Sequence, residues 1–139
     1  MSADSTTTTR SVLLYSDDAP VRAQVRQAVG SHVGEVDLEW HEVATYDALV
    51  ERVVPGRFDL LILDGEARKA GGMGVARELK NQVYNCPPIL VLTGRAQDAW
   101  LASWSLADAV VPRPLDALTL SDTVEGLLEG SLQQGVNVQ

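Results

Sequence analysis

The sequence predicts an α/β fold with a doubly wound sheet of five parallel strands. Along the 139 residues, short apolar segments alternate five times with segments of helical periodicity. This alternation is typical of right-handed crossovers between parallel strands. Residues 58–63 form an almost continuous apolar run, as in strands that are buried on both faces of a sheet. Polar residues follow four of the strands, and the carboxyl ends of such strands border the functional crevice.

The expected strands are short apolar runs that end in polar or turn residues, and we place them at residues 11–15, 35–44, 58–63, 88–92 and 108–111. The expected helices cover residues 20–29, 46–53, 73–84, 97–105 and 116–129. Pro20 suits a first helical turn, where its missing N–H costs nothing. Asp116 is placed to cap the last helix, and we expect Asp18 to cap the first one with a solvated carboxylate.

The composition predicts one ordered domain with polar ends. Residues 1–10 are expected to form a disordered leader, residues 11–130 the domain and residues 131–139 a flexible tail. Hydrophobic residues make up 45% of the chain and charged residues 22%, which is enough for an ordinary core.

Charge and cysteine usage narrow the class of protein. A net charge of −8 argues against nucleic-acid binding, which requires clustered basic residues. No apolar run approaches the roughly 20 residues that span a bilayer, so we expect no membrane insertion. The single cysteine, Cys86, excludes an internal disulfide and agrees with a reducing cytoplasm. We therefore expect a cytoplasmic protein that binds other proteins, as a monomer or a homodimer.

The polar residues at the strand ends form an ordered set: Asp17, Asp64, Thr93 and Arg113. Together with residues 64–72 (DGEARKAGG), the helix expected after them, and the Thr93-Gly94 and Arg113-Pro114 steps, this set resembles the receiver domain of response regulators. The resemblance covers about residues 11–129. The segment from Trp100 to Trp104 and the loop after Asp64 look like a small actinobacterial group of stand-alone receiver-like proteins.

The resemblance implies a flavodoxin-like (βα)5 receiver fold and a place in two-component, phosphorelay signal transduction, without enzyme activity. Asp64 would be the phospho-acceptor, and Thr93 and Arg113 would contact the phosphoryl oxygens. Phosphoryl transfer to a carboxylate also requires a divalent cation. Mg²⁺ prefers oxygen ligands, and the resemblance assigns these to Asp17, Asp64 and the backbone carbonyl of Glu66.

Four positions depart from the usual receiver pattern. Ser16 stands where the first acid of the usual acidic pair falls, which removes a negative charge from the metal site. Arg113 replaces a lysine, and its planar fork does not act like a compact ammonium group. Arg68 replaces a proline, and Val110 replaces an aromatic residue that often signals activation. We therefore expect weak or absent Mg²⁺ binding.

Several residues have a second interpretation. Asp64 could be an acceptor or only cap the loop backbone at a strand end. Arg113 could bind phosphate or form a standing salt bridge to Asp64 or Asp17. Trp100 is expected in the core, and Trp104 and Val110 are the candidate interaction surface, although both tryptophans could instead pack on the sheet. His32, His41 and Cys86 carry no recognisable metal or catalytic pattern.

Three functions follow from these alternatives. The first is a conventional Mg²⁺-dependent receiver that is switched by phosphorylation at Asp64. The second is a pseudo-receiver that binds a sensor kinase or a downstream target without phosphorylation. The third is a flavodoxin-like protein that binds a small ligand, but the sequence has no phosphate-binding glycine loop. We favour the second, because the departures at Ser16, Arg113 and Val110 affect metal binding, charge and signal readout separately.

Overall fold

The computed structural model describes residues 8–53, 58–65, 72–82, 86–94 and 107–129. The predicted tail, most of the predicted leader and the predicted helix at residues 97–105 lie outside these ranges. In the described part of the chain, no helix is long and apolar enough to cross a membrane.

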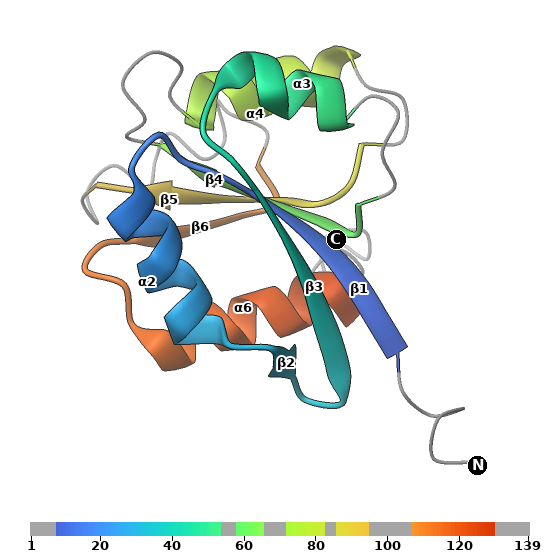
Figure 1. Cartoon of the computed structure of the whole chain (residues 1–139), viewed down its shortest axis with the longest axis vertical. Coiled ribbons are helices and arrows are strands. Elements are labelled where there is room, and N and C mark those ends of the chain that lie inside the picture. Colours follow the sequence, from blue (N-terminus) through green and yellow to red (C-terminus); the bar gives the residue numbers. More distant parts are fainter. Residues whose placement is uncertain (1–7, 54–57, 66–71, 83–85, 95–106, 130–139) are drawn as a thin grey trace, which may run out of the picture.

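The fold is a sheet with helices on both faces (Figure 1). The strands are β1 (Thr8–Tyr15), β2 (His32–Val33), β3 (Val36–Val43), β4 (Leu60–Asp64), β5 (Ile89–Thr93) and β6 (Ala109–Pro112). The described helices are α2 (Ala19–Val29), α3 (Tyr46–Val53), α4 (Gly72–Gln82) and α6 (Ala117–Glu129). The strand order is β2-β3-β1-β4-β5-β6, and all neighbours are parallel except β2 and β3. The predicted α/β class and its five parallel strands are confirmed.

Two details of the sheet differ from the sequence prediction. A sixth strand, β2, pairs antiparallel with β3 through a turn at Gly34, whose positive φ of 57° suits a glycine. The second difference is that β1 begins at Thr8, so the predicted leader boundary at residue 10 is wrong. Residues 8–10 have polar side chains, but the register pairs Thr8 with Val36 and continues along β3. Backbone pairing with a neighbouring strand therefore extends β1 beyond its apolar segment.

The sheet separates two layers of core. Successive residues of β1 and β4 point to opposite faces, so Val12, Leu14 and Ile62 pack on the side of α2 and α6. Leu13 and Leu63 pack on the side of α3 and α4. All residues of β4 and β5 are buried, which explains why the run at residues 58–63 does not alternate. Burial of each large apolar side chain contributes about 1.5–3 kcal/mol, so these two strands form a rigid support for the residues at their ends.

Aspartates were predicted to cap the first turns of α2 and α6, and only one of these predictions is confirmed. Asp116 caps α6, because its Oδ2 accepts the backbone N–H of Thr119 at 2.9 Å. Asp18 occupies the N-cap position of α2, but its side chain makes no capping hydrogen bond. The predicted side-chain cap at Asp18 is therefore wrong. Its backbone N–H instead donates to Oγ of Ser16 at 3.1 Å, which ties this segment to the end of β1.

Candidate functional site

Parallel strands bring the predicted polar residues to one edge of the sheet. Asp64 ends β4 and Thr93 ends β5, Ser16 directly follows β1, and Arg113 directly follows β6. Ser16 and Thr93 are fully buried and Asp64 is 2% exposed. Asp17, the other predicted acid, is exposed. The described structure therefore places a buried carboxylate between strand ends that also carry two hydroxyl groups and a guanidinium group.

Both carboxylate oxygens of Asp64 are engaged by neighbouring side chains. Nη2 of Arg113 lies 2.7 Å from Oδ1, and Oγ of Ser16 donates to Oδ2 at 2.7 Å. A buried carboxylate is costly unless it is paired and hydrogen-bonded, and these two contacts supply both conditions. Of the alternatives for Arg113, the ion pair with Asp64 is the one that this structure contains.

Arg113 is positioned by its backbone as well as by Asp64. Its N–H donates to the carbonyl oxygen of Thr93 at 3.0 Å, and the peptide bond to Pro114 is cis. Its side chain is 26% exposed. Nε is buried and has no hydrogen-bond partner among the described residues, although buried N–H donors are normally satisfied. The guanidinium group thus has one donor committed to Asp64 and one unmatched donor within the site.

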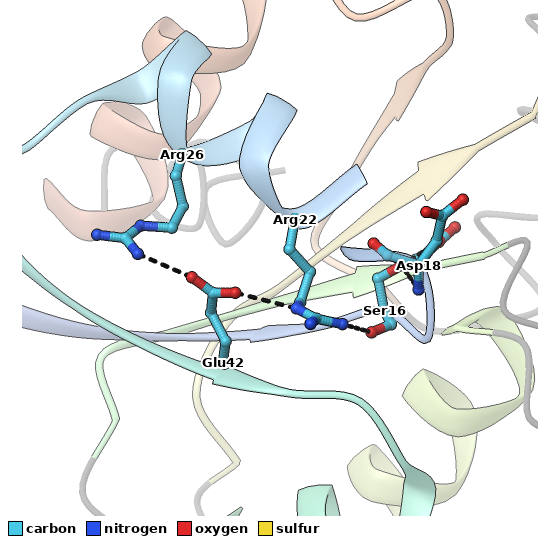
Figure 2. Close-up of polar contacts among 6 residues, drawn as sticks. Ser16, Asp18, Arg22, Arg26 and Glu42 are labelled. Carbon is cyan, nitrogen blue, oxygen red and sulfur yellow. Dashed lines mark hydrogen bonds and ion pairs between the residues drawn. The ribbon is translucent and has the colours of Figure 1, made fainter. Parts of the chain in front are cut away.

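Ser16 connects Asp64 to the neighbouring helix. Its hydroxyl donates to Asp64, and its carbonyl oxygen accepts a hydrogen bond of 2.6 Å from Nη1 of Arg22 (Figure 2). Arg22 also donates from Nε to Oε1 of Glu42 at 2.9 Å, and Nη1 of Arg26 lies 2.8 Å from Oε2 of the same carboxylate. A continuous polar network therefore leads from Asp64 to the side of α2 that faces β3.

Arg22, Arg26 and Glu42 also belong to this environment, and the sequence did not predict them as site residues. Arg22 and Arg26 are four residues apart in α2, which places them on one helix face. Two arginines at this spacing can pair with one carboxylate. The partner is in β3, however, and spacing along one helix does not reveal which residue of a distant strand lies opposite.

Gly65 keeps the end of β4 close to β5. Its N–H donates to the carbonyl oxygen of Leu92 at 2.8 Å. A Cβ atom at this position would lie 2.6 Å from the same oxygen, which is too close for any side chain. The glycine after Asp64 thus allows the two strand ends, and the residues that they carry, to approach each other.

Two of the predicted Mg²⁺ ligands, Asp17 and Asp64, lie at this edge of the sheet. The cation takes oxygen ligands in near-octahedral geometry and usually keeps several waters. Here Asp64 uses its oxygens to accept from a guanidinium and a hydroxyl, and Ser16 adds no charge. The described part of the chain contains no group of three His, Cys, Asp or Glu residues that could hold a metal. The weak or absent Mg²⁺ binding expected from the sequence stays a prediction. Glu66, whose carbonyl is the third predicted ligand, lies outside the described residues.

Tyr15 is the last residue of β1, directly before Ser16, and is only 2% exposed. Burial raises the pKa of its phenol, and the negative charges of Asp17 and Asp64 raise it further. The phenol is therefore held in its neutral form, as expected for a group that faces carboxylates in a poorly hydrated layer.

The predicted interaction residues are only partly described. Val110, in β6, is half-buried and packs against the core layer on the side of α3 and α4. Trp100 and Trp104 lie outside the described residues. The assignment of Val110 and Trp104 to an interaction surface stays a prediction.

Comparison with known proteins identifies close relatives in sequence. No family model matches the chain. A response regulatory protein of Mycobacterium tuberculosis, recorded from two strains, is 50% identical over 127 residues. The match covers 90% of this chain and 95% of the relative.

Solved structures agree in fold at much lower identity. The receiver domain of a Francisella response regulator matches with a TM-score of 0.73 and 15% identity, over 88% of this chain and 98% of that one. A CheY-like receiver domain protein from Methanospirillum hungatei gives 0.71 and 16%, over 92% and 99%. A Burkholderia pseudomallei response regulator with a phosphorylated aspartic acid and a calcium ion gives 0.65 and 14%, over 92% and 71%. Given the sequence identity to the mycobacterial relative and this shared fold, the chain belongs to the response-regulator family and has the receiver domain of two-component signalling.

Proposed function

We propose that this receiver acts by protein–protein interaction in a phosphorelay setting, with its Asp64 site held in one state by Arg113. The observation that carries this proposal is the 2.7 Å ion pair between Nη2 of Arg113 and Oδ1 of Asp64. The guanidinium supplies within the chain the positive charge that Mg²⁺ supplies in a phospho-accepting site. On this proposal Mg²⁺ is weakly bound or not bound, and the partner is a sensor kinase or a downstream target.

The geometry of phosphoryl transfer supports this interpretation. The acceptor oxygen must approach phosphorus in line and must be free to do so. In this protein one oxygen of Asp64 is paired with Arg113, and the other accepts from Ser16. A phospho-donor would therefore have to disrupt a buried ion pair and a hydrogen bond before transfer. Separation of a buried ion pair is unfavourable, so this pairing opposes phosphoryl transfer to Asp64.

A conventional switch at Asp64 is the second candidate, and one observation favours it. The buried Nε of Arg113, which has no partner among the described residues, is a donor that a phosphoryl oxygen could accept from. Thr93 would supply a hydroxyl from the end of β5. In this alternative Asp17, Asp64 and the Glu66 carbonyl would be the Mg²⁺ ligands, and Arg113 would turn from Asp64 to the phosphoryl group.

The two candidates are separated by NMR spectroscopy with Mg²⁺ and the phosphoryl mimic beryllofluoride. For the natural chain we expect no change in the backbone amide signals of Asp64, Gly65 and Thr93. The double variant Ser16→Asp/Arg113→Lys restores an acid and a compact cation, and it should respond to the mimic at millimolar Mg²⁺. A response of the natural chain that disappears in Asp64→Asn would establish the conventional switch instead.

A further inference from the structure

A groove runs between α2 and β3, beside the polar network that leads to Asp64. It is open to solvent and has a volume of about 470 Å³. This size is within the range of roughly 300–1,000 Å³ that is usual for ligand sites. Its lining includes small apolar and aromatic residues as well as charged ones, among them Ala19, Arg22, Ala23, Arg26, Trp40 and Glu42.

The charged residues make this groove locally positive on an acidic protein. Arg22 and Arg26 share the single carboxylate of Glu42, which uses one oxygen for each of them. A guanidinium has five N–H donors, and the ion pair with Glu42 uses one of those on Arg26. The Arg26 side chain is 50% exposed. Two arginines against one glutamate therefore favour an additional anionic group, and Arg26 is accessible to it.

Trp40 provides a fixed apolar surface in the same groove. Its Nε1 donates to the carbonyl oxygen of Gly30 at 2.9 Å, and its ring packs partly against the core layer beneath α2. The guanidinium carbon of Arg26 lies 5.9 Å from the ring centroid, within the range of a cation–π contact. Because these contacts hold the ring in place, a ligand would bind to it at little cost in conformational entropy.

We infer that this groove is a docking site for an acidic segment of a partner protein, with Arg26 pairing with a carboxylate and Trp40 contacting an apolar side chain. The inference rests on the proposed protein-binding function and deepens it by naming a surface. Exposed ion pairs alone contribute little, so a simple anion would bind weakly at Arg26. A peptide segment can supply both a carboxylate and an apolar side chain, and Trp and Arg are enriched among residues that dominate protein interfaces.

A chain of hydrogen bonds, part of which is shown in Figure 2, links this groove to Asp64. Arg22 donates both to Glu42 in the groove and to the carbonyl of Ser16, whose hydroxyl binds Asp64. Arg22 is thus linked to Asp64 through two hydrogen bonds and Glu42 through three, so a partner that contacts either residue would act on this network.

The test is an NMR titration of the full chain, without Mg²⁺ or phospho-donor, so that its outcome is independent of whether Asp64 is phosphorylated. The probe is a short capped peptide of alternating glutamate and leucine, and a peptide with glutamine in place of glutamate is the control. We expect saturable shifts of the Trp40 indole N–H and of the amides of α2. Arg26→Ala should weaken binding about two- to fivefold.

Arg52→Ala is the matched control variant, because Arg52 also lies over an aromatic ring, at 5.8 Å from that of Phe58, but outside the groove. It should leave binding unchanged. Circular dichroism checks folding, and Arg26→Gln replaces Arg26→Ala if the latter is unfolded. The inference is overturned if the glutamine peptide or inorganic phosphate gives the same shifts, if the Trp40 signal does not move, or if it moves only with protein concentration, which would indicate a second copy.

Discussion

At the scale of single residues, the main finding is that Asp64 is not an isolated acceptor. Its carboxylate lies at the end of a fully buried strand, is ion-paired with Arg113 and accepts a hydrogen bond from Ser16. The sequence identified each of these residues, and it raised the ion pair as an alternative to phosphate binding. Which alternative holds depends on side-chain geometry, because the same residues at the same strand ends are compatible with both.

Replacement of Arg113 should show how much the ion pair stabilises the fold. In Arg113→Ala the charge of Asp64 is left buried without a cation, so we expect a loss of about 3 kcal/mol in the free energy of unfolding. Urea denaturation at neutral pH measures this loss. The double variant Arg113→Met/Asp64→Asn removes both charges and should recover most of the stability. If Arg113→Ala alone is as stable as the natural chain, the pair does not hold the site.

Gly65 offers a second prediction at this scale. In Gly65→Ala the new Cβ would meet the carbonyl oxygen of Leu92 at 2.6 Å, so the ends of β4 and β5 must separate. We expect a lower melting temperature and shifted amide signals for Asp64 and Thr93. Gly30→Ala is a useful comparison, because no atom lies within 4 Å of a Cβ built there and any loss reflects its φ of 87°. Unchanged Asp64 and Thr93 signals in Gly65→Ala would contradict the close approach.

At the scale of elements, α6 shows how one helix combines a buried and an exposed side. Leu120 is fully buried in the core layer with α2, whereas Leu118, two residues earlier, is 70% exposed. Leu120→Ala should reduce the free energy of unfolding by about 2–5 kcal/mol, because it leaves a cavity in the core. Leu118→Ala should change it by less than about 0.5 kcal/mol. Similar losses in both variants, measured by urea denaturation, would show that α6 packs differently.

The ion pairs that Glu42 of β3 makes with Arg22 and Arg26 of α2 should weaken at low pH. Burial raises the pKa of Glu42, but the hydrogen bonds and charges of Arg26 and Arg22 outweigh this and hold it below its ordinary value of 4.5. A lowered carboxyl pKa in the folded state means that the link stabilises the protein above pH 4.5 and is lost as the pH falls through the folded-state pKa. Glu42→Gln should therefore reduce stability at pH 7 and weaken its dependence on pH below 4.5. If the stability of Glu42→Gln falls below pH 4.5 as steeply as that of the natural chain, Glu42 is not responsible for the pH dependence.

At the scale of the whole molecule, most of the fold was predictable, because alternating apolar and helical segments indicate parallel strands joined by helical crossovers. The buried run at residues 58–63 identified its centre, and the polar residues after the strands identified the site edge. The strand β2 was not predictable, since two residues carry no periodicity. The network of Arg22, Arg26 and Glu42 was not predictable either, because it joins a helix and a strand whose facing side chains are matched only by tertiary packing.

For the domain as a whole, we propose that the ion pair with Arg113 prevents phosphorylation of Asp64. The most direct measurement is the intact mass of the full chain after incubation with acetyl phosphate and Mg²⁺. The account predicts an unmodified chain, and partial modification of the Ser16→Asp/Arg113→Lys variant under the same conditions. Stoichiometric addition of one phosphoryl group to the natural chain, lost in Asp64→Asn, would contradict it.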